Sequence, residues 1–266
     1  DEHWLTLFYG AALLGAVTVP VNTRFKAQEL EYCLKQADCK ALFYAPRFLD
    51  IDYEAMVRDI RPKLPRLAHT VRAQELGAAP FVPGNARPED LPLIQFTSGT
   101  TAYPKGVMLT HDNMLRNAWA AGTRVGIRAE DRYFNCRPFF HVGGMWYHLF
   151  PSFAAGCTTV IMPQFDPQGV LELMAWHRVT NTHLVPTMIH TLLDQKNLAS
   201  FDLSALRMMF YAASSMPVEL LKRATETFAC DFAQGYGSTE GGAVTCLTPQ
   251  DHQRARAGHS ELLLSC

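Results

Sequence analysis

The second half of the chain alternates short apolar segments with segments of helical periodicity, and this alternation constrains the fold more than any other feature. Strands are expected at residues 93–96, 106–109, 132–136, 158–161, 182–185, 207–211, 231–234 and 243–246, with helices at 112–122, 166–177, 187–193 and 217–228. Strands and helices at this spacing are typical of an α/β fold with largely parallel sheets. In such folds ligands bind beyond the carboxyl ends of the strands, so the loops there are expected to carry the chemistry.

The first half shows the same alternation less regularly. Helices are expected at residues 4–14, 27–36 and 50–60, and strands at 17–21 and 40–44. Residues 76–92 are rich in Gly, Pro and Ala, which is typical of a loop between two compact parts. We therefore predict a first α/β subdomain at 1–80 and a second at 81–266. Because the chain starts at Asp1 without Met and stops abruptly at Cys266, we expect both ends to be cut points in a longer protein.

Composition excludes several classes of protein. Hydrophobic residues make up 48% and charged residues 18%, which is incompatible with intrinsic disorder. The net charge of −1 gives no global field for nucleic acid. The longest apolar run, residues 11–21, is too short to span a bilayer, so no transmembrane segment is expected. The seven cysteines form no C-x-x-C pair, which favours a reducing compartment, the cytoplasm, over a disulfide framework or a cysteine zinc site.

One loop carries the clearest chemical signal. Residues 95–106, Gln-Phe-Thr-Ser-Gly-Thr-Thr-Ala-Tyr-Pro-Lys-Gly, place four hydroxyl side chains and one Lys after a short apolar strand. Backbone N–H groups and hydroxyls in such a loop can hold phosphate, and Lys105 adds a positive charge for a polyphosphate. The ordinary alternative is a Ser/Thr-rich surface turn. A Walker A loop is disfavoured, because Lys105 follows Pro104 and a strand, not a helix, follows Gly106.

Residues 97–111 resemble the phosphate loop of the adenylate-forming, or AMP-binding, enzymes, which include acyl-CoA synthetases, luciferases and peptide-synthetase adenylation domains. Three further segments resemble motifs of this family: Gly15–Asn22 its early strand, Phe139–Gly144 its acyl-pocket motif, and Gln234–Glu240 its adenine and magnesium motif. The resemblance covers nearly the whole chain and implies the family's N-terminal domain. That domain has two largely parallel β-sheets flanked by helices in αβαβα layers, here truncated.

The resemblance also implies roles for individual residues. The β- and γ-phosphates of ATP would be held by Thr97, Ser98, Gly99, Thr100, Thr101 and Lys105. Mg²⁺ would be bound by Thr97 and Glu240, and Thr239 would contact the α-phosphate. The rest of the nucleotide would lie against Ala213, Ser214, Ser215, Gln234, Gly235, Tyr236, Gly237 and Ser238, with Tyr236 packed on adenine. The acid substrate would lie against His141, Val142, Gly143, Met145, Tyr211, Ala212, Gly235 and Gly237, and catalysis would depend on Lys105, Thr239, Glu240 and His141.

Several of these residues have ordinary alternatives. Glu240 could be a solvated loop carboxylate, Tyr236 a core aromatic and His141 a satisfied core histidine. Met145, Trp146 and Tyr147 either line an acyl channel or fill the core. The serines at 214 and 215 could equally be a simple turn before a helix. The spacing of His177, His183 and His190 does not suit zinc, so a structural role is expected for them.

The chain departs from the family pattern in two ways. Ala102 stands where the phosphate loop typically has Gly, which strains the loop if that position needs a positive φ. The chain also stops before the family's ribose-binding Asp, its hinge and its small C-terminal domain with a catalytic Lys.

The interpretation that follows is an acyl-CoA synthetase acting on a fatty or aryl acid, present as an N-terminal fragment that is itself inactive. The expected ligands are ATP, Mg²⁺, coenzyme A and a small carboxylic acid. Amino-acid substrates are disfavoured because residues 211–216 contain no acidic side chain for a substrate amine. The alternatives are another adenylating enzyme, luciferase-like or of the peptide-synthetase type, and a non-catalytic nucleotide- or acyl-binding module.

Overall fold

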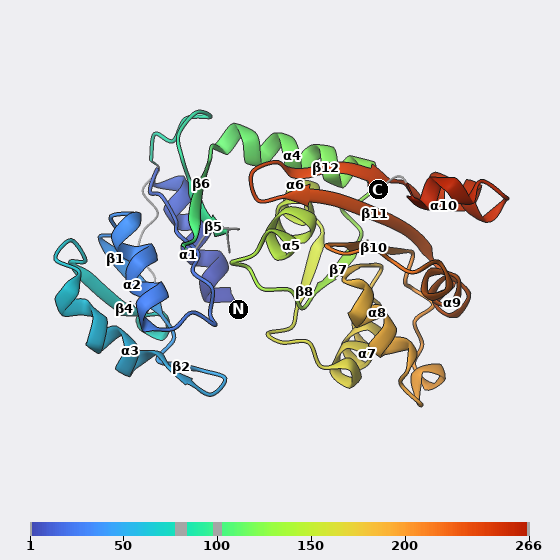
Figure 1. Ribbon diagram of the computed structural model, residues 1–266, viewed down its shortest axis with the longest axis horizontal. Coiled ribbons are helices and arrows are strands. Elements are labelled where there is room, and N and C mark those ends of the chain that lie inside the picture. Colours follow the sequence, from blue (N-terminus) through green and yellow to red (C-terminus); the bar gives the residue numbers. More distant parts are fainter. Residues whose placement is uncertain (1, 78–83, 98–102, 265–266) are drawn as a thin grey trace. The chain divides into compact units, whose positions relative to one another are not determined.

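The computed structural model describes residues 2–77, 84–97 and 103–264. The chain divides into two compact units, Asp1–Asp112 and Asn113–Cys266, each with its own hydrophobic core (Figure 1). The boundary predicted between residues 80 and 81 lies outside the described residues, so the division at that point stays a prediction.

The first unit packs helices against short strands. It contains α1 (Glu2–Leu13), α2 (Ala27–Gln36), α3 (Tyr53–Ile60), the parallel pair β1 (Ala41–Tyr44) and β4 (His69–Arg72), and the antiparallel pair β2 (Arg47–Phe48) and β3 (Ile51–Asp52). Helices α2 and α3 bury Leu30, Leu34 and Ile60 in a shared core. Asp52 caps the N-terminus of α3: its carboxylate accepts the Ala55 N–H at 2.9 Å and so satisfies a backbone donor of the first turn.

The last strands of the first unit along the chain form an antiparallel hairpin. Strand β5 (Leu93–Thr97) pairs with β6 (Lys105–Leu109), with Leu93 opposite Leu109 at the buried base and Thr97 opposite Lys105 at the open end. The two strands predicted here are therefore confirmed, while most of the loop predicted between them lies outside the described residues.

The strand expected at residues 17–21 does not form, which corrects the prediction. Only Thr18 pairs, in a single parallel bridge to Leu93. The Thr18 N–H donates to the Pro92 carbonyl at 2.8 Å, and the Ile94 N–H donates to the Thr18 carbonyl at 2.9 Å. Pro20 has no amide hydrogen, so a ladder cannot continue through it.

The second unit is built on a six-stranded sheet with the order β12–β11–β10–β9–β7–β8. Its strands are β7 (Arg132–Asn135), β8 (Thr158–Ile161), β9 (Asn181–Leu184), β10 (Met208–Ala212), β11 (Asp231–Ser238) and β12 (Gly242–Leu247). All neighbouring strands are parallel except β11 and β12, which form an antiparallel edge. The α/β class with largely parallel sheets is therefore confirmed.

Helices cover both faces of this sheet (Figure 1). They are α4 (His111–Arg124), α5 (Val142–Gly144), a π-helical turn (Met145–Leu149), α6 (Phe150–Ala155), α7 (Pro167–Trp176), α8 (Pro186–Leu193), α9 (Val218–Phe228) and α10 (Pro249–Arg256). Helices α7, α8 and α9 pack on one face, where they form the larger core with strand residues such as Met209 and Tyr211. On the other face Phe210 and Ala212 pack with Tyr147 of the π-helical turn. Successive residues of β10 therefore face opposite sides of the sheet, as a strand requires.

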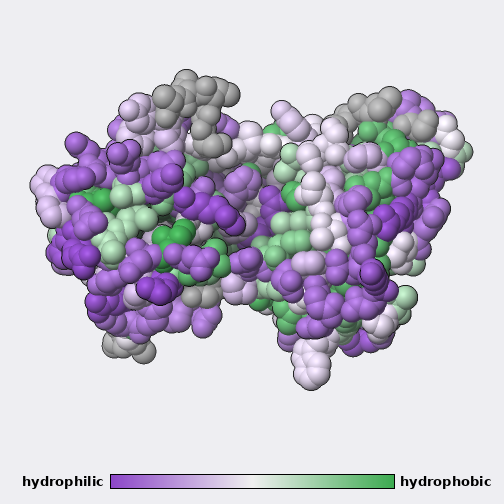
Figure 2. Space-filling view, turned by 60° about the horizontal axis from the view of Figure 1, so that its bottom comes forward, coloured by the Kyte–Doolittle hydropathy of each residue, from purple (hydrophilic) through white to green (hydrophobic). Residues whose placement is uncertain are grey.

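The surface is mixed in polarity. Hydrophilic residues form most of the face shown in Figure 2, and hydrophobic residues lie between them in small groups. Within the described ranges, none of the helices has both the length and the apolar content needed to cross a membrane.

Candidate functional site

The predicted phosphate-binding segment spans the open end of the β5–β6 hairpin in the first unit. Thr97 and Lys105 are directly opposite each other in the ladder, and the Thr97 hydroxyl lies 3.5 Å from the Lys105 carbonyl. The Lys105 side chain is exposed and makes no ion pair with any described residue. The remaining predicted residues of this loop, Ser98, Gly99, Thr100 and Thr101, lie outside the described residues, as does Ala102.

In the second unit, the other predicted residues lie at or after the carboxyl ends of β7, β10 and β11. His141 precedes α5, after the turn that leaves β7. Its Nδ1 accepts the Gly143 N–H at 3.0 Å, so the neutral ring carries its hydrogen on Nε2. Partial loss of hydration, and then the positive charge of Arg137, lower the pKa of this histidine. A neutral His141 can donate a hydrogen bond from Nε2 without carrying a charge.

Gly143 connects His141 to two further basic side chains. The His183 ring donates from Nδ1 to the Gly143 carbonyl at 3.0 Å. A Cβ on Gly143 would lie 2.5 Å from Nη2 of Arg137, so the guanidinium packs directly on this glycine. His183 is fully buried, and burial followed by the charge of Arg137 keeps its pKa well below the ordinary value. Val142 lies beside them in α5, and Met145 is buried at the start of the π-helical turn.

The ends of β10 and β11 place their predicted residues on two different faces of the sheet. Tyr211 is buried, and its hydroxyl lies 3.1 Å from Oε1 of Gln234 and 2.9 Å from Nε2 of His252. Ala212 pairs with Gly235 on the neighbouring strand and belongs to the core of the opposite face. Tyr211 and Gln234 are thus part of a buried polar network, whereas Ala212 and Gly235 adjoin the face of Tyr147.

Tyr147 fills the space above the two glycines of β11. A Cβ on Gly237 would lie 2.3 Å from the Tyr147 hydroxyl, and a Cβ on Gly235 would lie 3.1 Å from the same ring and 2.3 Å from Phe210. The rings of Tyr147 and Phe210 are 5.2 Å apart. Both line a small cavity of about 20 Å³, which has room for about one water molecule. Gly235 and Gly237 are therefore required by the close approach of these aromatic rings.

Strand β11 extends beyond the sheet as an arm paired only with β12. Ser238 lies opposite Gly242, and the Ser238 hydroxyl accepts the Gly241 N–H at 3.1 Å. The Tyr236 side chain is 61% exposed, so it is not a core aromatic. Glu240, in the turn of the arm, is exposed and makes no hydrogen bond or ion pair with the residues that the structure describes, while Thr239 is half-buried. The Glu240 carboxylate is therefore free to meet a ligand.

Asn117 of α4 fixes the turn of this arm. Its amide nitrogen donates to the carbonyls of Gly241 and Ala243 at 3.3 and 3.1 Å, and its Oδ1 accepts the Ala243 N–H at 3.0 Å. Gly242 has a φ of 63°, and a Cβ there would lie 2.6 Å from Asn117 Oδ1. The turn that carries Glu240 is therefore held by side-chain bonds from a helix and by a required glycine.

A sharp turn follows β10. Ala213 has a φ of 77°, a left-handed conformation that is strained for a residue with a Cβ. Ser214 and Ser215 after it are exposed, and α9 begins at Val218. The turn therefore presents the backbone of residues 213–215 beyond the carboxyl end of the sheet.

The described residues are suited to a Mg²⁺ ion whose other ligands come from a bound phosphate compound. Across the described ranges, no group of three or more His, Cys, Asp or Glu side chains could hold a metal ion. Glu240 is instead a single open carboxylate, and Mg²⁺ is commonly bound by one or two carboxylates together with substrate phosphates.

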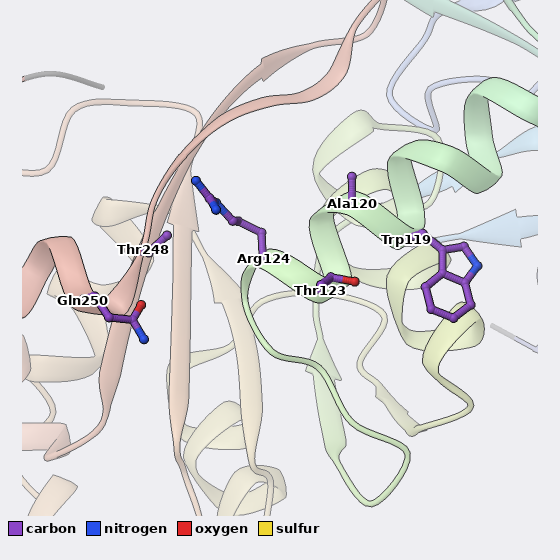
Figure 3. Close-up of a pocket in the computed structure, with 6 residues that line it drawn as sticks. All are labelled: Trp119, Ala120, Thr123, Arg124, Thr248 and Gln250. Atoms are coloured by element: carbon purple, nitrogen blue, oxygen red, sulfur yellow. The ribbon is translucent and has the colours of Figure 1, made fainter.

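One pocket of the second unit is lined by none of the predicted site residues. Its volume is about 510 Å³, and it is lined by Trp119, Ala120, Thr123 and Arg124 of α4 together with Thr248 and Gln250 (Figure 3). Figure 3 shows these side chains around an open hollow between α4 and the start of α10.

The sequence analysis missed two residues that shape the site, Arg137 and Asn117, and did not decide the role of a third, Tyr147. Arg137 stands directly before the Pro-Phe-Phe-His segment, where a charged residue after a buried strand was a usable signal. Tyr147 was left open between core and channel. Asn117 gave no signal, because its role depends on bonds to residues more than 120 positions later.

Comparisons with known proteins agree on one family. A protein-family model described as AMP-binding enzyme matches residues 2–263. Acyl-CoA ligase SID4 of Ajellomyces capsulatus is 33% identical over 92% of this chain and 46% of its own length. A substituted indenyl-propanoyl:CoA ligase of Mycobacterium tuberculosis is 34% identical over 94% of this chain and 52% of its own. The chain thus spans about half the length of these curated relatives.

A solved structure gives the same result for the fold. The inhibitor-bound N-terminal domain of FACL13 from Mycobacterium tuberculosis superposes with a TM-score of 0.85 at 29% identity, covering 96% of this chain and 65% of that domain.

Proposed function

The chain belongs to the AMP-binding enzyme family, and we propose that it is the major part of the N-terminal domain of an acyl-CoA synthetase. The proposed reaction has two steps. A carboxylate oxygen attacks the α-phosphorus of ATP and expels pyrophosphate, giving an acyl adenylate. The thiolate of coenzyme A then attacks the acyl carbon and releases AMP. The two curated relatives described above are both named as coenzyme A ligases. Their names support coenzyme A as the acyl acceptor, in place of the acceptor of a luciferase-like or peptide-synthetase enzyme.

The observation that carries this proposal is the arm formed by β11 and β12. It carries Tyr236, exposed on β11, and Thr239 and Glu240, half-buried and exposed in the turn that Asn117 fixes. In the proposed site Tyr236 packs on adenine, Thr239 contacts the α-phosphate and Glu240 binds Mg²⁺. The metal, when bound, would neutralise phosphate charge. The backbone of residues 213–215 and Ser238 would complete the nucleotide side of the site.

The acid is proposed to lie beside His141 and Gly143. A neutral His141 can donate from Nε2 to a carboxylate oxygen and so orient it toward the nucleotide. Lys105 and Thr97, with the hydroxyls of residues 98–101, are proposed to hold the β- and γ-phosphates. Adenylation brings two anionic reactants together, so it requires positive charge and hydrogen-bond donors of the kind that these residues carry.

The acid is proposed to have a fatty or aryl skeleton. The substituted indenyl-propanoyl group in the name of one relative supports a carbon-rich acid.

The six free cysteines among the described residues support a reducing compartment such as the cytoplasm.

A panel of carboxylic acids in a pyrophosphate-release assay, with and without coenzyme A, tests the proposal on the full-length protein. We expect acid-dependent pyrophosphate release and, with coenzyme A, an acyl thioester. Release of pyrophosphate without thioester formation would instead favour another adenylating enzyme. Nucleotide binding without any release would favour a non-catalytic binding module.

A further inference from the structure

The guanidinium of Arg137 has no counter-ion in the described part of the chain. Arg137 follows β7 at the carboxyl end of the sheet, and its backbone is fixed by Asn135: the Arg137 N–H donates to Asn135 Oδ1 at 2.9 Å, and Asn135 Nδ2 donates to the Arg137 carbonyl at 3.1 Å. Its side chain is half-buried, and Nη1 is fully enclosed without a hydrogen-bond partner. A desolvated charge that lacks a partner is costly, so this arrangement is incomplete without an acceptor.

The groups around the guanidinium cannot supply that acceptor charge. It packs on Gly143, whose N–H and carbonyl are bonded to His141 and His183. Both imidazoles are kept neutral by burial and by Arg137 itself. The internal stretches outside the described residues, 78–83 and 98–102, contain no Asp or Glu in the sequence. The described residues therefore leave the positive charge of Arg137 unpaired, and an anionic group of a bound molecule would complete it.

We propose that Arg137 binds a second anionic group on the acid substrate, so that the preferred substrates are dicarboxylic acids that are converted to monothioesters. This inference rests on the proposed function. The reacting carboxylate loses its charge when the acyl adenylate forms. A fixed guanidinium bound to the reacting carboxylate would therefore stabilise the bound acid more than the acyl adenylate. A second carboxylate keeps its charge throughout, so its ion pair with Arg137 holds the acid in place during both steps. His141, the neutral donor on the other side of Gly143, serves the reacting carboxylate.

Matched acids test this proposal in the full-length protein. Adipate is compared with hexanoate, and terephthalate with benzoate, in wild type, Arg137→Leu, Arg137→Lys and the control Arg178→Leu, which removes an exposed arginine of the second unit. In wild type we expect a higher kcat/KM for each diacid than for its monoacid. Arg137→Leu should raise the KM for diacids about 30-fold, leave that for monoacids within about threefold, and leave the KM for ATP unchanged. Arg137→Lys should recover part of the preference.

Two results would overturn the proposal. One is a wild-type preference for the monoacids. The other is a fall in kcat/KM that Arg137→Leu causes equally for the diacid and the monoacid of each pair, and that Arg137→Lys does not reverse. That result would indicate a structural role or contact with the reacting carboxylate.

Calorimetric titration of adipate separates this inference from the proposed function. If no acid supports pyrophosphate release, the proposed function fails. Adipate binding that is present in wild type and lost in Arg137→Leu would still establish the anion site. Equal binding to both proteins, or no binding to wild type, would reject it.

Discussion

Lys105 is an exposed cation at the open end of the β5–β6 hairpin, opposite Thr97 and without an ion pair to any described residue. Such a side chain is free to meet the terminal phosphates of ATP. We expect Lys105→Ala to raise the KM for ATP about tenfold or more, since hydrogen bonds to charged groups contribute about 1.5–3 kcal/mol. The KM for the acid should change little. Lys105→Arg, which keeps the charge, is the matched control. An unchanged KM for ATP together with an unchanged adenylation rate would count against this assignment.

Glu240 is the corresponding open carboxylate in the second unit. Glu240→Gln keeps its size and removes the charge that Mg²⁺ prefers. We expect the adenylation rate to fall about tenfold or more, which corresponds to ~1.4 kcal/mol of transition-state stabilisation. The rate is measured across a Mg²⁺ titration, with Glu226→Gln on the exposed surface of α9 as the control. A normal rate at every Mg²⁺ concentration would exclude the metal role.

At the scale of elements, the β11–β12 arm depends on Asn117 of α4. Asn117→Ala removes three hydrogen bonds from the turn that carries Glu240. At about 1 kcal/mol for each bond, the local cost is enough to loosen the turn. We expect a rise in the KM for ATP with a smaller change in melting temperature. Asn117→Asp, which keeps the acceptor for the Ala243 N–H but not the donors, should be intermediate. Full ATP use by Asn117→Ala would show that the arm needs no such support.

The elements themselves were largely predictable, because their periodicity is local. The helix at 27–36 and the strand at 158–161 have the predicted bounds. Strand β11 was predicted to end at residue 234, and the structure extends it to Ser238. Its last residues, Gly-Tyr-Gly-Ser, have little intrinsic strand preference and are held by pairing with β12.

The site was predictable only in part, for a physical reason. His141, Tyr236 and Glu240 belong to contiguous sequence motifs near the ends of strands. The contacts of Arg137 with Gly143 and of Tyr147 with Gly237 join residues from different segments and depend on tertiary packing. No spacing in the sequence encodes them.

At the scale of the whole molecule, buried histidines make stability depend on pH. His148 is fully buried with Nε2 near the Tyr133 carbonyl, and burial lowers its pKa to about 3. Between that value and the unfolded pKa near 6.5, the unfolded chain binds more protons than the folded one, so stability falls as pH falls. The slope approaches about 1.4 kcal/mol per pH unit for each such group.

Urea unfolding at pH 7.5 and 5.0 measures this effect. We expect a clearly lower unfolding free energy at pH 5.0, and a smaller difference in His148→Gln. Equal pH dependence in the two proteins would mean that this histidine is not held neutral by the fold.

The 266-residue chain is expected to be catalytically incompetent by itself, even when folded. It spans about half the length of its curated relatives, and we propose that the ribose anchor and a catalytic Lys lie in the rest of a longer protein. Phosphate-loop contacts alone would leave the α-phosphate poorly oriented, and orientation accounts for several kcal/mol of such barriers.

The most direct test of the central claim is acid-dependent ATP–pyrophosphate exchange, measured side by side on the purified 266-residue chain and on the full-length protein. We predict exchange in the full-length protein that requires both Mg²⁺ and a carboxylic acid, and none above background in the chain alone. Absence of acid-dependent exchange in the full-length protein, over a panel of fatty, aryl and dicarboxylic acids, would contradict assignment of this chain to an acid-activating synthetase.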